Sequence, residues 1–306
     1  MQRCLLRVLT LPSLPFKLGY DVSGTVVAVG SAVSEDLKPG VEVYSRVPEE
    51  YRGTASDFVL SPVSATTLKP SSLSHVEAAS LPLVALTALR VLDKAEKHFP
   101  DGLKDKTVFI PAGLSGVGSI AAQLAKRVFH AANVITTLST AKIAKVDELL
   151  GQGLFDQVVD YTKENPAKTI DAGSVDFMFD ITGQAMSSLQ LIKKGGLILT
   201  VAGAPFGESL KEAMPNMPFL PRYGLLAYGS FLQFRARRYG VEFHHVFMRP
   251  SAEDLARLRG WVDEGLVKPL VGKTAQLEDI KAIREACEEI HSGKGGTGKF
   301  VIEVEK

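Results

Sequence analysis

Residues 106–126 read KTVFIPAGLSGVGSIAAQLAK, and this stretch decides the fold. Its first part, Thr107 to Ile110, is a short apolar run with β-branched residues, which predicts a buried strand. A turn with three glycines follows, and apolar residues then recur at helical spacing from Ile120 to Ala125. Strand, glycine turn and helix in this order are typical of a dinucleotide-binding unit.

Each glycine of the turn has an expected role. We expect Gly113 to permit the sharp turn, Gly116 to let the backbone approach a pyrophosphate, and Gly118 to let the helix lie close to the strand. The free amides at the helix N-terminus would then face the phosphates. The alternative is a glycine turn that serves packing alone. The predicted phosphate-binding residues are Gly113, Ser115, Gly116, Val117 and Gly118.

Composition limits the classes of function. The chain has 306 residues, 45% of them hydrophobic and 23% charged, which is typical of a globular enzyme with two domains. The formal net charge of +1 gives no basic excess for nucleic acid or a membrane surface. Two cysteines, Cys4 and Cys287, are too few for a disulfide framework or a four-cysteine zinc site. The sequence contains no run of about 18 apolar residues, so no membrane span is predicted.

The low cysteine content also bears on the compartment. It fits reduced intracellular surroundings, so we expect a cytoplasmic protein. Residues 1–10 contain Arg3 and Arg7 and no acid, a pattern that resembles a short organellar targeting signal. The mitochondrion is therefore the alternative.

Short strands are expected before the glycine turn. Their close spacing predicts a small antiparallel or barrel-like β unit. Ser74 and Glu77 form a predicted capping box, and a helical pattern covers Val84 to Leu92. The predicted segments are an extended lead-in at Leu5–Pro15 and strands at Thr25–Val29, Val41–Ser45 and Phe58–Leu60.

From Lys106 onward, strand-like and helical patterns alternate. This alternation predicts βαβ units and a parallel sheet with helices on both faces. The predicted strands are Thr107–Ile110, Asn133–Leu138, Gln157–Asp160, Val175–Asp180, Leu197–Ala202 and Val241–Met248. The predicted helices are Ser119–Phe129, Ala141–Leu150, Ala185–Ile192, Ala252–Glu264 and Leu277–His291, and a closing strand is expected at Lys299–Val304.

The fold class predicted from this order is α/β. A doubly wound Rossmann domain of residues 88–265 would be inserted in a smaller β-rich substrate domain of residues 1–87 and 266–306. Ligands usually bind at such domain interfaces.

The end of the second expected strand bears on cofactor choice. An acid that binds a ribose 2′-hydroxyl would lie there, but residues 136–142 read TTLSTAK, without Asp or Glu. Ser139 and Lys142 could instead bind a 2′-phosphate through charge-assisted hydrogen bonds. The sequence therefore favours NADPH over NADH. The alternative is that Lys142 is a solvated helix residue, as most lysines are.

Four stretches together resemble a known family. They are Gly19–Gly30 (GYDVSGTVVAVG), Ala79–Ala88 (ASLPLVALTA), Ala112–Lys126 and Gly298–Val301 (GKFV). In this order they are similar to the zinc-independent medium-chain dehydrogenase/reductase superfamily, in its quinone oxidoreductase and enoyl reductase branch. The resemblance implies that the smaller domain is GroES-like.

The resemblance also implies an activity. The expected reaction is hydride transfer from NADPH to a quinone or an α,β-unsaturated carbonyl compound, without zinc. The alternatives are an enoyl-thioester reductase of lipid or polyketide metabolism and a catalytically silent NADPH-binding protein. An alcohol dehydrogenase is disfavoured because no set of zinc ligands is evident.

Further residue roles follow from the resemblance alone. Thr87 would lie near the nicotinamide ribose and phosphates, Gly203 would border the nicotinamide, and Lys299 of the closing strand would bind cofactor. Ser139, Lys142 and Tyr161 would surround the 2′-phosphate. The alternatives are a buried helix hydroxyl bonded to the backbone for Thr87 and surface packing for Tyr161.

Tyr20 stands where zinc-dependent relatives carry a histidine. Tyrosine is not a usual zinc ligand, so we predict no catalytic zinc. The adjacent His244 and His245 fall in an expected strand, where their side chains point to opposite faces. Tyr20 is a candidate hydrogen-bond donor to the substrate oxygen, and the alternative is that it packs beneath the nicotinamide.

Two segments affect the expected activity and assembly. Only 18 residues precede Gly19, whereas members of the resembled family have several tens, so either the β domain is reduced or the sequence begins late.

Phe206 and the proline-rich Met214–Tyr223 are interpreted as a substrate-pocket wall or a dimer contact. The resemblance implies homodimers that pair through an edge strand, expected near Leu225–Phe231.

Overall fold

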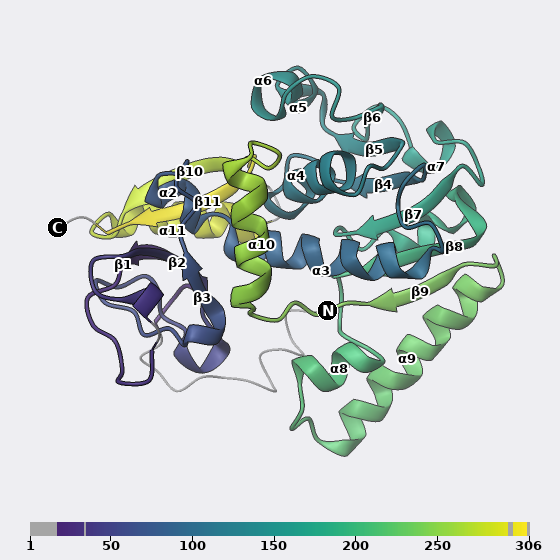
Figure 1. The fold of residues 1–306 in the computed structure, drawn as a ribbon. Helices are drawn as coiled ribbons and strands as arrows, with labels where there is room; N and C mark the ends of the chain where they lie inside the picture. The colour runs from purple at the N-terminus through teal and green to yellow at the C-terminus, as the bar shows by residue number, and fades with distance from the viewer. Residues whose placement is uncertain (1–16, 34, 293–295, 305–306) are drawn as a thin grey trace. The chain divides into compact units, whose positions relative to one another are not determined.

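The computed structural model describes residues 17–33, 35–292 and 296–304. The chain divides into two compact units, whose elements are labelled in Figure 1. Among the described residues, unit 1 comprises 90–113 and 124–247, and unit 2 comprises the rest. The domain boundaries predicted from the sequence stay a prediction.

Unit 1 is built on a six-stranded parallel sheet. Its strand order is β6-β5-β4-β7-β8-β9. The strand β4, which is the first of these along the chain, lies in the middle, and later strands are added first on one side of it and then on the other. This is the doubly wound Rossmann order, so the predicted α/β fold class is confirmed. The strands are β4 (Thr107–Pro111), β5 (Asn133–Leu138), β6 (Gln157–Asp160), β7 (Val175–Asp180), β8 (Ile192–Thr200) and β9 (Glu242–His245).

The sheet forms where the sequence has short apolar runs. In β4, Val108, Phe109 and Ile110 are fully buried, as expected for a parallel strand covered on both faces. The predicted bounds of β5, β6 and β7 agree with the structure residue for residue. Each is a compact β-branched or aromatic run that ends in a polar residue or a turn.

The helices of unit 1 agree less well with the predictions. The expected helix Ala185–Ile192 is wrong: two short 3₁₀ turns, η5 (Ala185–Ser187) and η6 (Leu189–Leu191), lead directly into β8. The expected edge strand near Leu225–Phe231 is also wrong, because that segment lies inside a helix and β9 is the edge strand. The helical segments are η4 (Leu124–Val128), α5 (Thr140–Ile143), α6 (Val146–Leu150), α7 (Pro166–Thr169), α8 (Glu208–Ala213) and α9 (Phe219–Arg237).

Unit 2 combines two small sheets with helices. Its antiparallel sheet contains β1 (Asp21–Thr25), β2 (Glu42–Arg46) and β3 (Thr66–Leu68), and β10 (Val271–Gln276) pairs in parallel with β11 (Lys299–Glu303). Its helices are α2 (His75–Ala79), α4 (Gly116–Gln123), α10 (Ala252–Asp263) and α11 (Ile280–His291). The helix α3 (Pro82–His98) starts in unit 2 and ends in unit 1. Short 3₁₀ turns at Glu35–Leu37, Glu49–Tyr51 and Val63–Ala65 complete this part of the chain.

Burial explains which strands of unit 2 form. Tyr44 of β2 is fully buried, and its hydroxyl donates to the Leu255 carbonyl oxygen of α10 at 2.6 Å. The predicted strand at Phe58–Leu60 is wrong, and the predicted Thr25–Val29 strand lies earlier, as β1. Val27 and Phe58 are exposed, so neither side chain adds to the core. The predicted capping box is confirmed on α2. The expected lead-in at 5–15 lies outside the described residues.

Candidate functional site

The turn after β4 differs from the prediction in one respect. Ala112, not Gly113, adopts the left-handed conformation, with φ 57°, and its N–H donates to Thr137 Oγ1 at 3.2 Å. The prediction that Gly113 supplies the turn is therefore wrong. A Cβ on Gly113 would lie 2.4 Å from Thr136 Oγ1 and 2.7 Å from Phe155 Cζ, so packing against β5 requires glycine there.

The second glycine opens helix α4, within unit 2. Ser115 caps this helix, because its Oγ accepts from the Gly118 N–H at 3.1 Å. A Cβ on Gly116 would lie 3.0 Å from Lys299 Cδ and 3.2 Å from Val84 Cγ1. Gly116 therefore lets the stem of Lys299 approach the first turn of α4. An ammonium and a helix N-terminus are both attractive to anions.

Lys299 is held in place by a partly buried carboxylate. Its Nζ lies 3.4 Å from Asp21 Oδ2, and Asp21 Oδ1 accepts from the Leu83 N–H at 2.9 Å in the first turn of α3. Burial raises the pKa of Asp21, and the nearby Lys299 opposes that shift. Asp21 thus orients Lys299, and its carboxylate also accepts from a free backbone N–H at the N-terminus of α3.

The predicted residues Thr87 and Tyr20 also lie in unit 2. The Thr87 hydroxyl donates to the Leu83 carbonyl oxygen at 2.6 Å inside α3, which is the alternative role considered for it. The Arg46 guanidinium lies 4.8 Å from the centre of the Tyr20 ring. Burial, followed by hydrogen bonding to Glu49, raises the pKa of Tyr20, so the phenol keeps its proton at neutral pH.

Unit 1 brings together the three residues predicted at the 2′-phosphate. Ser139 follows β5 and Tyr161 follows β6, and the Tyr161 N–H donates to the Leu138 carbonyl oxygen at 3.1 Å. The Lys142 N–H donates to the Ser139 carbonyl oxygen at 2.8 Å in the turn that begins α5. The three residues therefore lie at the same edge of the sheet, near the carboxyl ends of the neighbouring strands β5 and β6.

An acid also lies at this edge, although the local sequence has none. Asp160 is the register partner of Leu138, and its carboxylate accepts from Thr140 Oγ1 at 2.5 Å and from Thr162 Oγ1 at 2.6 Å. These threonine hydrogen bonds lower the pKa of Asp160. Its oxygens are therefore already occupied by hydroxyl donors, and Lys163 lies 3.8 Å away as a counter-charge.

A buried acid that the sequence analysis did not single out ends strand β7. Asp180 is buried, and its Oδ1 accepts from the backbone N–H groups of Thr182, Gly183 and Gln184 at 3.2, 2.8 and 2.9 Å. Its Oδ2 accepts from the Ala185 N–H at 3.2 Å. This side chain fixes the loop after β7 at the carboxyl edge of the sheet. An acid that ends a buried strand before Thr-Gly was the available signal.

The loop after β8 is tied to the same carboxylate. Thr200 Oγ1 donates to Asp180 Oδ2 at 3.1 Å, and the Val201 N–H donates to the Asp180 carbonyl oxygen at 3.1 Å. Gly203, predicted to border the nicotinamide, has φ 93° in this loop. Asp180 therefore positions two neighbouring loops of unit 1.

The expected alternation of His244 and His245 on β9 is confirmed. His244 is exposed, whereas His245 is buried beside the Phe206 ring, with a centroid separation of 5.7 Å. His245 Nδ1 is buried without a hydrogen-bond partner among the described residues. Both histidines line a cavity of about 430 Å³ in unit 1, together with Phe206, which the sequence analysis interpreted as a pocket wall or a dimer contact. None of the predicted cofactor-binding residues, nor Tyr20, lines this cavity.

We predict that His245 makes the protein less stable in mild acid. Burial lowers the pKa of His245 from 6.5 to about 4, so between these values the unfolded chain binds a proton that the native state does not. This residue should therefore reduce the free energy of unfolding by about 2 kcal/mol between about pH 7.5 and pH 5. Urea unfolding at both pH values measures the loss. His245→Phe should remove it, and the exposed neighbour variant His244→Gln should keep it.

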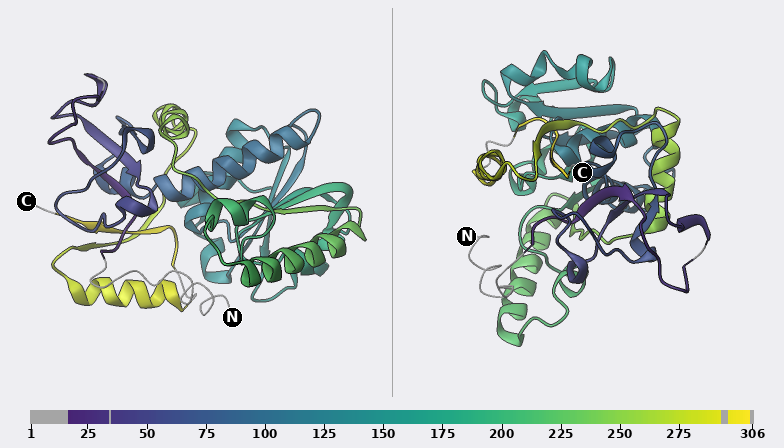
Figure 2. Two further views of the ribbon diagram at one scale, coloured as in Figure 1. Left: turned by 90° about the horizontal axis from the view of Figure 1, so that it is seen from below. Right: turned by 90° about the vertical axis from the view of Figure 1, so that its left-hand side faces the viewer.

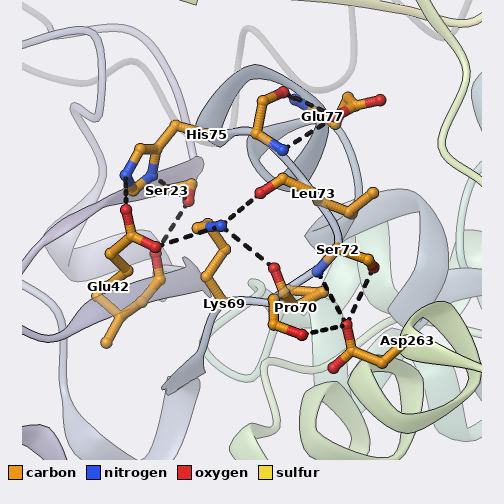
Figure 3. A network of polar contacts seen from close by, with 12 residues as sticks. Ser23, Glu42, Lys69, Pro70, Ser72, Leu73, His75, Glu77 and Asp263 are labelled. Atoms are coloured by element: carbon orange, nitrogen blue, oxygen red, sulfur yellow. Dashed lines mark hydrogen bonds and ion pairs between the residues drawn. The ribbon is translucent and has the colours of Figure 1, made fainter.

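A second polar cluster lies in unit 2, where β1, β2 and α2 meet (Figure 3). Ser23 Oγ lies 2.9 Å from His75 Nδ1, and His75 Nε2 lies 3.0 Å from Glu42 Oε1. The order serine, histidine, carboxylate resembles a catalytic triad. However, Ser23 Oγ also donates to the Val43 carbonyl oxygen at 3.0 Å. Hydrogen bonding to Lys69 lowers the pKa of Glu42. We interpret the cluster as a link between sheet and helix.

Metal-site geometry and membrane-spanning helices are both missing from the part of the chain that the structure describes. In residues 17–33, 35–292 and 296–304, no three His, Cys, Asp or Glu side chains gather closely enough to hold a metal ion. The absence of catalytic zinc stays a prediction. Across the same residues, no helix combines the length and apolar character that a membrane crossing requires.

Comparison with known proteins identifies the family. Residues 155–302 match the sequence profile described as zinc-binding dehydrogenase. The chain is 39% identical over 299 residues to 2-methylene-furan-3-one reductase of Solanum lycopersicum, covering 95% of this chain and 64% of that protein. The chain thus spans less than two thirds of the tomato protein.

Two further proteins are similar over most of their length. The mitochondrial NAD(P)H oxidoreductase RTN4IP1 of Mus musculus is 30% identical, over 95% of this chain and 71% of that protein. The quinone oxidoreductase structure from Coxiella burnetii has a TM-score of 0.75 at 26% identity, over 99% of this chain and 83% of that chain. With the Rossmann strand order and the glycine turn, these similarities confirm that the chain belongs to the medium-chain dehydrogenase/reductase superfamily of nicotinamide-dependent oxidoreductases.

Proposed function

We propose that this protein is an NADPH-dependent oxidoreductase that reduces a quinone or an α,β-unsaturated carbonyl compound without zinc. The observation that carries the proposal is the close approach of the Lys299 stem to the first turn of α4. Gly116 makes this approach possible, because a Cβ at that position would lie only 3.0 Å from Lys299 Cδ. An ammonium beside a helix N-terminus fits a pyrophosphate. When bound, NADPH supplies a hydride to an electron-poor carbon of the acceptor.

The chain's own residues have distinct roles in this proposal. Gly113, Ser115, Gly116, Val117 and Gly118 form the turn that receives the pyrophosphate, and Lys299 neutralises its charge. Thr87 and Gly203 would adjoin the nicotinamide half. Tyr20, whose phenol is protonated at neutral pH and bonded to Glu49, would donate a hydrogen bond to the substrate oxygen in place of Glu49. The β-rich segments 1–87 and 266–306 would supply the substrate domain.

Two similar proteins support the class of acceptor. The tomato relative is named for the reduction of a methylene-furanone, which is an enone, and the Coxiella burnetii structure is that of a quinone oxidoreductase. Such acceptors delocalise the charge that develops as they are reduced, so they depend less on a Lewis acid. In this proposal, a hydrogen bond from Tyr20 polarises the substrate oxygen enough for hydride transfer.

Steady-state NADPH oxidation with a panel of quinones, enones and enoyl thioesters tests the proposed function. We expect turnover with at least one quinone or enone, and a lower kcat with Tyr20→Phe. Binding of NADPH without any turnover would identify a silent binding protein instead. Absence of binding to both NADPH and NADH in calorimetry would contradict the proposal.

We predict that Lys142 selects NADPH. Loss of one charge-assisted hydrogen bond in Lys142→Ala should weaken NADPH binding roughly 10- to 100-fold and leave NADH binding unchanged. Calorimetric titration with both cofactors measures the ratio. Lys145→Ala, at an exposed lysine of the same segment, is the matched control. Equal losses for both cofactors would show that Lys142 does not contact a 2′-phosphate, and Asp160 would then merit the same test.

A further inference from the structure

The outer face of helix α9 in unit 1 is apolar although it is exposed. Leu220, Tyr223, Phe231 and Phe234 are 80%, 56%, 56% and 59% exposed. With the exposed Ala227 they recur every three or four residues, which places them on one side of the helix. Tyr223 also stacks against Phe219, with the ring centres 4.3 Å apart. The result is an exposed apolar face that carries three aromatic rings, referred to below as the aromatic face.

The opposite face of α9 is apolar as well, and it is already packed. Leu232 and Ala236 belong to the core of unit 1, and a Cβ on Gly229 would lie 2.4 Å from Phe206 Cβ. The helix runs alongside the edge strand β9 in Figures 1 and 2. A surface helix ordinarily turns a polar face to water. Apolar side chains on both faces therefore indicate that the outer face has a partner of its own.

The charges of α9 point to the chemistry of that partner. No Asp or Glu occurs between Glu212 and Glu242, whereas four arginines do, and three of them, Arg235, Arg237 and Arg238, gather at the end of the helix. The near-neutral charge of the whole chain conceals this local excess. A second copy of the chain would present the same acid-free face, with no carboxylate for these arginines, whereas an anionic surface would offer one counter-charge for each.

We propose that α9 lies in the headgroup layer of a membrane that contains anionic lipids. Its aromatic face would enter the boundary with the acyl chains, where Tyr and Phe are stable. The three terminal arginines would bind lipid phosphates. Because the inner face stays packed on unit 1, the helix would lie along the surface. This proposal is independent of the cofactor and the reaction.

Vesicle flotation with the full chain tests the proposal. We expect the protein to float with vesicles of phosphatidylcholine that contain about 30% phosphatidylserine and to stay at the bottom with phosphatidylcholine alone. Binding should weaken with added salt, because ionic strength screens the arginines. Equal flotation with both vesicle types, or with neither, would overturn the proposal.

Two variants separate the charge from the aromatic face. Removing three charges in Arg235→Gln/Arg237→Gln/Arg238→Gln should reduce partitioning roughly 100-fold, at about fivefold per charge. Phe231→Gln/Phe234→Gln should reduce it about tenfold or more. Both sets are exposed, so circular dichroism and the thermal midpoint should stay at wild-type values. Partitioning within twofold of wild type in both variants would overturn the proposal.

A matched control uses another exposed helix. Lys281→Gln/Arg284→Gln/Ile290→Gln on α11 removes two charges and one exposed apolar residue, and it should leave partitioning unchanged. Sedimentation equilibrium without lipid tests the competing occupant, a second copy. A dimer that dissociates on Phe231→Gln/Phe234→Gln would show that α9 is a subunit interface and would overturn membrane binding.

Discussion

Replacing Asp180 with alanine is expected to lower the free energy of unfolding by about 3 kcal/mol. The carboxylate accepts from four backbone N–H groups, at 2.8 to 3.2 Å, and from Thr200 Oγ1 at 3.1 Å. Its removal leaves the buried amide of Ala185 without an acceptor, while water reaches the exposed positions 182–184. Urea unfolding followed by circular dichroism measures the loss.

Two variants define what the Asp180 result means. Asp180→Asn keeps one oxygen for the loop amides but turns an NH₂ group toward another donor, so about half of the loss is expected. Asp171→Ala removes an exposed carboxylate from the preceding turn and should change stability by less than about 0.5 kcal/mol. An Asp180→Ala midpoint equal to wild type would show that the loop is held by other contacts. A stability loss with intact cofactor affinity would separate the fold from the proposed site.

The sheet was predictable because its signal is local. β5 and β7 are short runs whose branched and aromatic side chains are mostly buried, and such runs stand out in any sequence. Helix α9 was not predictable in the same way. Its apolar residues lie on both faces, so the helical period that reveals an amphipathic helix is weakened. The edge strand that the resemblance implies was therefore expected near Leu225–Phe231, inside what is a helix.

The candidate site shows the same division between local and distant information. Ser139, Lys142 and Tyr161 were expected together, and the adjacency of β5 and β6 brings them to one edge. The pairing of Asp160 with that edge depends on register, which the sequence does not reveal. The expected role of Gly113 was wrong because the need for glycine comes from Thr136 and Phe155, which are distant along the chain, and not from its own backbone angles.

Replacing Gly116 with valine is expected to weaken both NADPH and NADH binding by at least about 100-fold. A Cβ at this position would already lie 3.0 Å from Lys299 Cδ and 3.2 Å from Val84 Cγ1. The two methyl groups of valine must displace the lysine stem, and they cover the first turn of α4. Both changes act on the shared pyrophosphate, so the two cofactors should lose affinity equally, unlike in Lys142→Ala.

Calorimetry with each cofactor measures the effect of Gly116→Val, and Gly260→Val in α10 is its control. Nothing lies within 4 Å of a Cβ on Gly260, so that variant introduces valine into a helix without a clash. Gly116→Ala should fall between the two, since its single methyl group needs only a small movement of Lys299. If folded Gly116→Val binds NADPH as wild type does, the pyrophosphate does not rest on this turn. Lys299→Met would then decide whether the ammonium binds phosphate at all, because it keeps the stem that packs against Gly116 and removes only the charge.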